Sequence, residues 1–373
     1  MISDQPEPAW QAESFTQARQ HFLHACESAG VAVQTYSHPL TGPQGEELAT
    51  DVAKFGSAGA TRMLVMVSGV HGVESFSGSA AQIGWIETKQ YQSLPEDTAV
   101  LMIHLINPWG SAYLRRYNED NVDLCRNFLD FSSNKPENPA YTDEHANLTL
   151  GAAIGERGEL ALPYLEELIA KRGMKSVLDT FMQGQYQYAD GFGYGGHEPV
   201  WSNVTLRQIL ESHTQGIERA CVVEFHTGLG PWAYGTLITL HSGHELARVR
   251  EYFGPWTVGP AERTEGDEAF HAVTGHTIEG YRQGFVDADL LAVTMEFGSY
   301  PPVESLALML QEHVLTHAPA GLETELENVR AKMLEYHHPE DWEWRCAHWT
   351  RAQQIIRQAM RSLTHELTHQ AGE

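Results

Sequence analysis

Four side chains that could bind a metal or carry a proton stand at the ends of short apolar runs in the sequence. They are His71, Glu74, His226 and Glu296. Short apolar runs bounded by glycine or polar residues are typical of buried parallel strands. Open α/β sheets bind their ligands at the carboxyl ends of such strands, so all four side chains stand where a ligand site is expected.

The first three of these residues could form a zinc site. Imidazole nitrogen and carboxylate oxygen are good zinc ligands, and the short turn from His71 to Glu74 lets this pair converge on one ion. Catalytic zinc takes three protein ligands and keeps one position for water, which gives His226 a role as the third ligand. The His-x-x-Glu spacing is not specific by itself, because it recurs elsewhere, for example at 276–279. Purely structural roles for these residues stay open.

Glu296 is the candidate general base. A carboxylate at the end of an apolar strand costs free energy unless it has a partner or a task. A metal-activated water needs a nearby base to take its proton, and Glu296 could do this. Glu224 competes for the role, two residues before His226. It lies deeper in its strand, so we interpret it as a support for the site or for the fold.

The segment 115–128 supplies guanidinium groups after another expected strand. One arginine near a metal could clamp a substrate carboxylate bidentately. A second could stabilise the oxyanion that forms when water adds to a carbonyl. The alternative is a set of surface ion pairs with the acidic residues of the same segment, which are Glu119, Asp120 and Asp123.

A competing metal motif lies near the end of the sequence. Residues 365–369 read His-Glu-Leu-Thr-His, the zincin pattern of two histidines on one helical face with a glutamate base. Only four residues follow it, so no segment remains for a third ligand, and helix ends fray readily. We expect a solvated helix end there. The zincin hypothesis predicts that truncation before residue 360 abolishes activity.

Composition excludes several classes of function. The 373 residues carry a formal charge of -25, which disfavours binding to nucleic acid and to anionic lipid. No apolar run is long enough to span a membrane, and the polar, acidic start does not resemble a signal peptide. The four cysteines are far apart and form no Cys-x-x-Cys pair. We therefore expect a cytoplasmic protein with no membrane or nucleic-acid partner.

The pattern of apolar residues predicts an α/β fold in a single catalytic domain spanning 1–373. Strands are expected near 64–69, 99–106, 220–225 and 290–295, and helices are expected between and after them. A core over about 30–320 would carry an N-terminal helix at 8–29 and a helical tail at 321–368. Further helices are expected at 76–90, 162–185, 203–216 and 303–316, and residues 129–150 are expected to form a surface loop.

Five motifs, taken in order, resemble the M14 zinc carboxypeptidase superfamily, and in particular its DUF2817 branch of carboxypeptidase-like proteins. The motifs lie at 69–74, 107–110, 122–128, 224–228 and 295–298. The resemblance implies a mixed, twisted sheet of about eight strands flanked by helices. It also implies one Zn²⁺ per chain, with His71, Glu74 and His226 as ligands and Glu296 as general base.

The same resemblance assigns roles to the segment 115–128. It implies that Arg126 binds the substrate carboxylate and that Arg116 polarises the scissile carbonyl. Asp123 would hydrogen-bond a zinc-ligating imidazole, that of His71. Cys125 stands where the family has an asparagine that helps the arginine hold the carboxylate, and a thiol is a poor substitute. Tyr281 is the candidate for the tyrosine that closes over the substrate in the family's peptidases.

These features predict a zinc-dependent hydrolase of amide or peptide bonds that uses metal-activated water. The expected substrate is a small peptide or an N-acyl amino acid with a carboxylate. Two alternatives stay open. One is a zinc-dependent deacylase of small N-acyl amino acids with the same metal site. The other is a protein that binds metal or carboxylate without catalysis, although such a protein would have no need of a base at Glu296.

Overall fold

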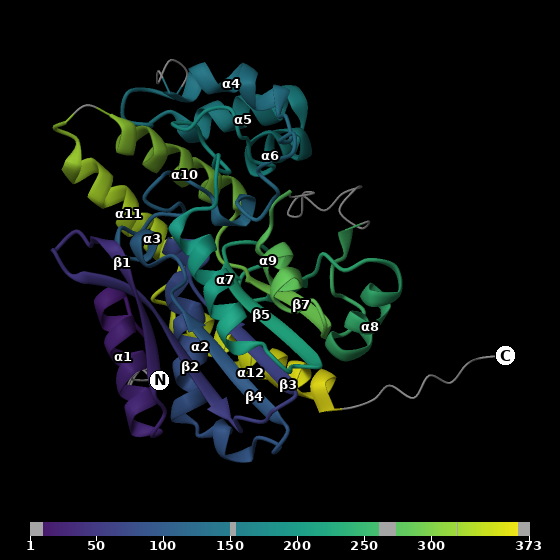
Figure 1. The fold of residues 1–373 in the computed structure, drawn as a ribbon. Helices are drawn as coiled ribbons and strands as arrows, with labels where there is room; N and C mark the ends of the chain where they lie inside the picture. Colours follow the sequence, from purple (N-terminus) through teal and green to yellow (C-terminus); the bar gives the residue numbers. More distant parts are fainter. Residues whose placement is uncertain (1–9, 150–153, 261–273, 319, 365–373) are drawn as a thin grey trace.

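A mixed sheet of seven strands forms the centre of the computed structural model, which describes residues 10–149, 154–260, 274–318 and 320–364 (Figure 1). The strand order is β1-β2-β4-β3-β5-β7-β6. In chain order the strands are β1 Val33–Thr41, β2 Glu47–Gly56, β3 Arg62–Val67, β4 Thr98–His104, β5 Arg219–Thr227, β6 Gly235–Ile238 and β7 Asp289–Phe297.

The four central strands β4, β3, β5 and β7 run parallel, and β2 and β6 flank them in the antiparallel direction. The central strands are almost wholly apolar because helices cover both of their faces. Because the four central strands run parallel, their carboxyl ends meet at one edge of the sheet. In the register of β5 and β7, His226 lies directly opposite Glu296.

Four helices cover one face of the sheet, and the largest apolar core cluster of the described residues lies between them and the strands. This layer consists of α1 Phe15–Ser28, α2 Ser75–Glu87, α8 Gly243–Phe253 and α12 Trp342–Thr364. The opposite face is covered by α7 Trp201–His213 and α9 Thr277–Gly284, which pack on a second cluster. Burial of this apolar surface on both faces is the main force that holds the layers together.

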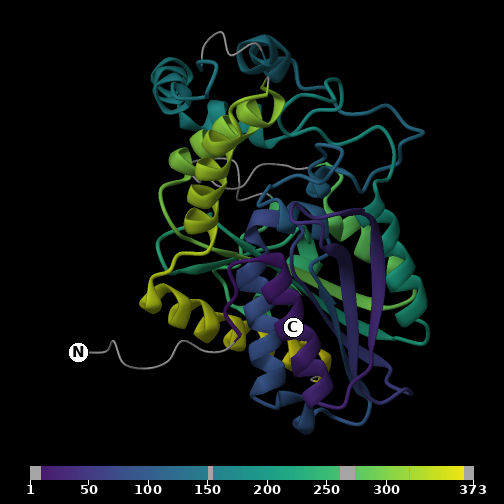
Figure 2. The same ribbon diagram turned by 90° about the vertical axis from the view of Figure 1, so that its left-hand side faces the viewer.

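Further helices form a lobe beyond one end of the sheet, which the two ribbon views show at the top (Figures 1 and 2). The lobe contains α4 Pro139–Thr149, α5 Ala161–Arg172, α6 Met174–Met182, α10 Pro302–His317 and α11 Glu323–His337. Its apolar cluster includes Val73 and Tyr117, which belong to the loops after β3 and β4. The lobe thus packs against the carboxyl ends of the parallel strands. Short elements complete this edge, namely α3 Pro108–Ala112, η1 Gly72–Glu74 and η3 Leu124–Arg126.

The predicted α/β class, the four apolar strands and the terminal helices are confirmed. Two expectations about elements are wrong. Residues 139–149 are helical although a loop was expected over 129–150, and the helix expected over 162–185 is two helices that Gly173 separates at φ +79°. The mixed sheet is also confirmed, with seven strands in the described residues where about eight were expected.

The helical tail predicted at 321–368 is described as far as Thr364, where α12 ends. The His365–His369 motif lies outside the described residues. None of the described helices combines the length and the apolar character that a bilayer crossing requires.

Candidate metal centre

The turn after β3 brings His71 and Glu74 to the carboxyl edge of the sheet. Close packing of this turn against α3 explains its glycines, because a Cβ on Gly72 would lie 2.0 Å from the carbonyl carbon of Gly110. The backbone of the turn is also fixed by hydrogen bonds from Gly72 and Val73 to the carbonyl groups of the segment 115–116. The ligand-bearing turn is therefore rigid before any ion binds.

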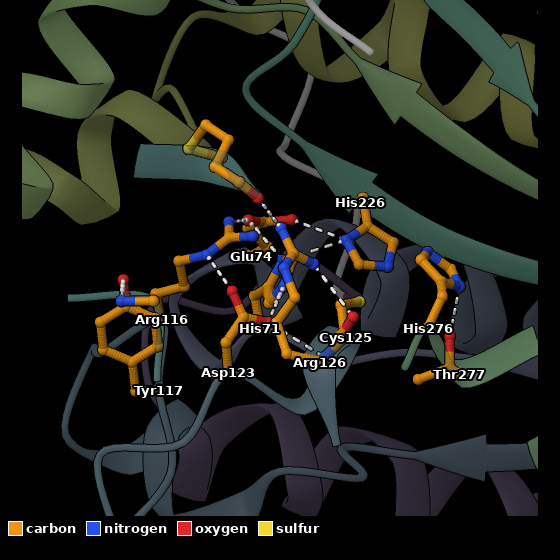
Figure 3. Close-up of polar contacts among 12 residues, drawn as sticks. His71, Glu74, Arg116, Tyr117, Asp123, Cys125, Arg126, His226, His276 and Thr277 are labelled. Carbon is orange, nitrogen blue, oxygen red and sulfur yellow. Dashed lines mark hydrogen bonds and ion pairs between the residues drawn. The ribbon is translucent and has the colours of Figure 1, made fainter. Parts of the chain in front are cut away.

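His71, Glu74 and His226 come together in this turn and at the end of β5 (Figure 3). Glu74 Oε1 lies 2.9 Å from His71 Nδ1, Glu74 Oε2 lies 3.1 Å from His226 Nδ1, and the two Nδ1 atoms are 3.2 Å apart. Ligands placed about 2.0–2.1 Å from a tetrahedral zinc lie about 3.3 Å from one another, so the three groups fit such an ion. Two imidazole nitrogens that face each other at this distance can share at most one proton, which also favours a cation between them.

The opposite nitrogen of each imidazole contacts a buried carboxylate. His71 Nε2 lies 3.2 Å from Asp123 Oδ1, and His226 Nε2 lies 2.7 Å from Glu224 Oε1. A carboxylate that accepts a proton from one ring nitrogen leaves the other nitrogen free to bind a metal and fixes the direction of the ring. Both histidines therefore present Nδ1 to the same point.

The charges of these groups are strongly coupled to one another. Although burial favours the neutral acid, His71 and His226 hold the pKa of Glu74 well below its ordinary value. Although burial disfavours charge on an imidazole, Glu224 and Glu74 raise the pKa of His226 well above its ordinary value. Burial likewise disfavours the charged form of Asp123, but Arg116 and Arg126 hold its pKa well below the usual range. The ionised carboxylates make the centre a site for positive charge.

Two other groupings of possible metal ligands among the described residues both include Cys125. Burial raises the pKa of the Cys125 thiol well above its ordinary value, and Glu224 and Asp123 raise it further. The set of His71, Glu74 and His226 offers two imidazole nitrogens and a carboxylate, which are the three protein ligands that a catalytic zinc ion takes.

Glu296 lies beside this set on β7, directly opposite His226 in the strand register. Its side chain is 8% exposed, and its Oε2 atom is buried without a hydrogen-bond partner. Burial raises the pKa of Glu296 to about 8, an effect that His226 opposes and Glu74 reinforces. A buried carboxylate oxygen without a partner is costly to the fold, which suggests that it has a task.

Arg116 lies at the edge of the same set. Its Nε donates to Asp123 Oδ2 at 3.1 Å, and its Nη1 donates to Glu74 Oε1 at 3.1 Å. These two bonds hold the guanidinium group next to the point where His71 and His226 converge. Positive charge in a partly buried position of this kind is suited to stabilising an oxyanion.

Arg126 is placed differently, because backbone carbonyls surround it. It is 4% exposed, its Nη1 donates to the carbonyl of Cys125 at 3.0 Å, and its Nη2 donates to the carbonyl of Met182. Its Nε is buried without a partner. The backbone of Cys125, rather than its side chain, contacts the arginine, and its N–H donates to Asp123 Oδ1.

Tyr281 is 1% exposed and lies behind His226, on α9. Its hydroxyl donates to Glu224 Oε2 at 2.9 Å. Thr277, one turn earlier on the same helix, donates to both oxygens of Glu224 at 3.0 and 2.8 Å. This buried position differs from that of a tyrosine that closes over a substrate.

Sequence reasoning missed Thr277, Met182 and His337 as neighbours of the centre. The Nδ1 atom of His337 lies 3.1 Å from the carbonyl of Thr227, next to His226. The spacing of Thr277 and Tyr281 by four residues was a usable signal, because such residues share one face of a helix. No comparable signal marks Met182, which contributes only a backbone carbonyl.

Residues 11–351 match a protein family that is described as a protein of unknown function, DUF2817. The chain belongs to the DUF2817 family. No curated protein matches this DUF2817 chain.

Solved structures resemble the DUF2817 chain in fold. Carboxypeptidase A from Helicoverpa armigera is 11% identical, with 91% of this chain and 78% of that chain covered and a TM-score of 0.47. Bovine thrombin-activatable fibrinolysis inhibitor is 13% identical, with coverages of 89% and 99% and a TM-score of 0.44. A Shewanella amazonensis protein provisionally assigned to the succinylglutamate desuccinylase/aspartoacylase family is 17% identical, with coverages of 78% and 72% and a TM-score of 0.37.

Proposed function

We propose that this chain is a zinc-dependent hydrolase of amide bonds in small substrates that carry a carboxylate, with a carboxypeptidase-like mechanism. The observation that carries the proposal is the convergence of His71 Nδ1, His226 Nδ1 and both oxygens of Glu74, at mutual distances of 2.9 to 3.2 Å. The unpartnered oxygen of Glu296 beside them supports catalysis in addition to binding.

His71, Glu74 and His226 would hold the zinc ion, which supplies Lewis acidity toward a carbonyl oxygen and lowers the pKa of water. Glu296 would be ionised once a bound cation lowers its pKa, and it would then accept a proton from the attacking water as the new carbon–oxygen bond forms. It would then pass this proton to the leaving nitrogen as the carbon–nitrogen bond breaks. Arg116 would donate hydrogen bonds to the oxygen on which negative charge develops.

Arg126 would bind the substrate carboxylate. A buried guanidinium group recognises a carboxylate through paired, charge-assisted hydrogen bonds. In the structure its Nη2 faces the carbonyl of Met182. A substrate carboxylate would therefore replace a neutral acceptor with a charged one, and this exchange favours the anion over a neutral amide.

A deacylase of N-acyl amino acids is the second candidate function. The backbone near Gly184 covers Arg126 and leaves little room beyond a bound carboxylate, and an N-acyl amino acid ends at its carboxylate as a C-terminal peptide does. Peptidase and deacylase would use the same residues in the same roles. A panel of C-terminal peptides and N-acyl amino acids, each with its amidated counterpart, distinguishes them by relative kcat/KM.

The first test is metal content and turnover in three full-length proteins. They are the parent chain, Glu296→Gln, and a His71→Ala/Glu74→Ala variant, each also carrying His365→Ala and His369→Ala to remove the competing motif. We expect one zinc per chain in the first two and almost none in the third. Loss of a general base should lower kcat of Glu296→Gln by about 10²- to 10⁴-fold while zinc stays bound.

Two outcomes would contradict the proposal. Equal zinc in the parent and in the His71→Ala/Glu74→Ala variant would show that the ion binds elsewhere. Unchanged hydrolysis in Glu296→Gln across the whole panel would remove the proposed base and with it the mechanism.

A further inference from the structure

Glu224 is buried on the side of the His226 ring that faces away from Glu74. Its side chain is 2% exposed, and its Oε1 lies 2.7 Å from His226 Nε2. Burial of a carboxylate is costly unless donors satisfy both of its oxygens. The residues that donate to Glu224 therefore indicate its role.

The donors come from α9. Thr277 Oγ1 lies 3.0 Å from Glu224 Oε1 and 2.8 Å from Oε2, and the Tyr281 hydroxyl lies 2.9 Å from Oε2. Thr277 is 0% exposed and Tyr281 is 1% exposed, so both hydroxyls are shielded from bulk solvent. The four-residue spacing places both hydroxyls on the same face of the helix. Two neutral donors therefore fix the plane of the carboxylate.

We propose that Thr277 and Tyr281 are positioning residues that act through Glu224 on His226, and that they set the metal affinity of the centre. The inference rests on the proposed function, since it assigns His226 as a metal ligand. With its plane fixed, Glu224 can present one oxygen to His226 Nε2–H. That bond selects the tautomer in which Nδ1 carries no proton and points to His71 and Glu74.

The contacts favour this role over packing alone. An apolar side chain would fill the interior beside β5 without the cost of a buried charge. The carboxylate instead connects two hydroxyls to Nε2 of a single imidazole, and the other nitrogen of that imidazole, Nδ1, lies 3.1 Å from Glu74 Oε2. The helix α9 is thereby connected to the metal centre by hydrogen bonds.

The test compares zinc binding by full-length variants. Tyr281→Phe and Thr277→Val each remove one donor to Glu224, and Thr277→Ser keeps the hydroxyl. Tyr141→Phe is the matched control, because Tyr141 is also 1% exposed, but its hydroxyl accepts from the backbone N–H of Phe192 in the helical lobe. Zinc Kd is measured by chelator competition, the visible spectrum is recorded with Co²⁺, and stability is measured on the metal-free proteins.

We expect zinc Kd to rise by about 10-fold in Tyr281→Phe and by about 10- to 100-fold in Thr277→Val. The Co²⁺ bands should shift in both variants, because the direction of the imidazole changes. Thr277→Ser should restore the parent values, and Tyr141→Phe should lose stability without any change in zinc Kd.

Unchanged zinc Kd and unchanged Co²⁺ spectra in Tyr281→Phe and Thr277→Val would overturn the positioning role, even if both variants were less stable. This failure is distinguishable from that of the proposed function. If the parent itself bound no zinc, the metal centre would be wrong. If the parent bound zinc and turned over substrate while the variants matched it, only the positioning role would be wrong.

Discussion

Arg116 and Arg126 lie on the same segment but differ in what holds them. Arg116 bonds to two carboxylates, those of Asp123 and Glu74. Arg126 bonds to two backbone carbonyls, which are weaker acceptors. Arg116 is thus fixed beside the proposed reaction centre, and Arg126 can exchange its partner for a substrate anion.

This difference predicts separate kinetic effects of two substitutions. Arg116→Gln should lower kcat by about 10²- to 10³-fold with a small change in KM, because its contact with the oxyanion exists only in the transition state. Arg126→Gln should raise KM for carboxylate substrates by about 10-fold or more. Steady-state kinetics on carboxylate and amidated forms of one substrate provide the measurement.

The amidated substrate is the control for Arg126→Gln. Parent and variant should hydrolyse it with similar KM, because no carboxylate is present to be lost. Equal effects of the two substitutions on kcat and on KM would contradict the assignment of distinct roles.

The metal-ligand candidates could be predicted at this scale, because His226 stands where an apolar strand ends and because His71 and Glu74 lie in the turn that follows another. The lack of a hydrogen-bond partner for Glu296 Oε2 could not be predicted, because it depends on which side chains surround that atom in the folded chain. Asp123 was placed near an imidazole by the family resemblance alone. The hydroxyls that hold Glu224 depend on the rotation of α9, which no local sequence pattern fixes.

At the scale of elements, the segment after α6 covers the proposed carboxylate site. Gly184 adopts φ +84°, and a Cβ there would lie 2.9 Å from Cδ of Arg126. The carbonyl of Met182 and the hydroxyl of Tyr186 bond to the side chain and the backbone of Arg126, respectively. The close approach of backbone to arginine therefore requires glycine at this position.

The Cβ added in Gly184→Ala should clash with Cδ of Arg126. We expect a loss of about 1 kcal/mol of stability from the positive φ, together with a rise in KM for carboxylate substrates of several-fold or more. Gly173→Ala is the matched control, since Gly173 has φ +79° and an added Cβ would meet nothing within 4 Å. Thermal denaturation and steady-state kinetics on both variants separate strain from contact.

If Gly173→Ala raised KM as much as Gly184→Ala did, backbone strain within the lobe would explain the effect. The proposed contact with Arg126 would then have no specific role in substrate binding.

The central strands were predictable because their residues are uniformly apolar. The strands β1, β2 and β6 were missed. β1 lies at the edge of the sheet and is mostly exposed, polar residues interrupt the apolar ones of β2, and β6 has only four residues, so none contains a continuous apolar run of strand length. The polar composition of 129–150 suggested a loop, but α4 forms there because Tyr141 and Leu148 pack into the helical lobe. Tertiary burial overrode local composition in that segment.

At the scale of the whole molecule, buried histidines link stability to pH. Burial lowers the pKa of several imidazoles, to about 3 for His104, His313 and His348 and to about 4 for His276 and His337. In the folded protein these rings stay neutral at pH values where an unfolded chain would protonate them. Unfolding in mild acid must therefore take up protons.

The sign of the effect follows from proton uptake. A lowered folded pKa gives stability that is fully present above the unfolded value of 6.5 and is lost as pH falls toward 4. Each such imidazole contributes about 1.4 kcal/mol per pH unit in that window. Glu296 has the opposite effect on stability in this window. Its pKa is raised to about 8, so the folded state holds about one proton that the unfolded state releases above its ordinary value of 4.5. His226, whose pKa is raised, is protonated in both states below 6.5 and adds no slope there.

The zinc-free protein should therefore lose stability steeply as pH falls from about 6.5 to about 4.5. His348→Phe removes one of the responsible rings, whose Nε2 is buried without a partner between Trp344 and Phe297. We expect this variant to reduce the slope of unfolding free energy against pH by about 1.4 kcal/mol per pH unit. Denaturant titrations of parent and variant across this range give both slopes. If the slopes were identical, His348 would already be protonated in the folded state, and its burial would not hold it neutral.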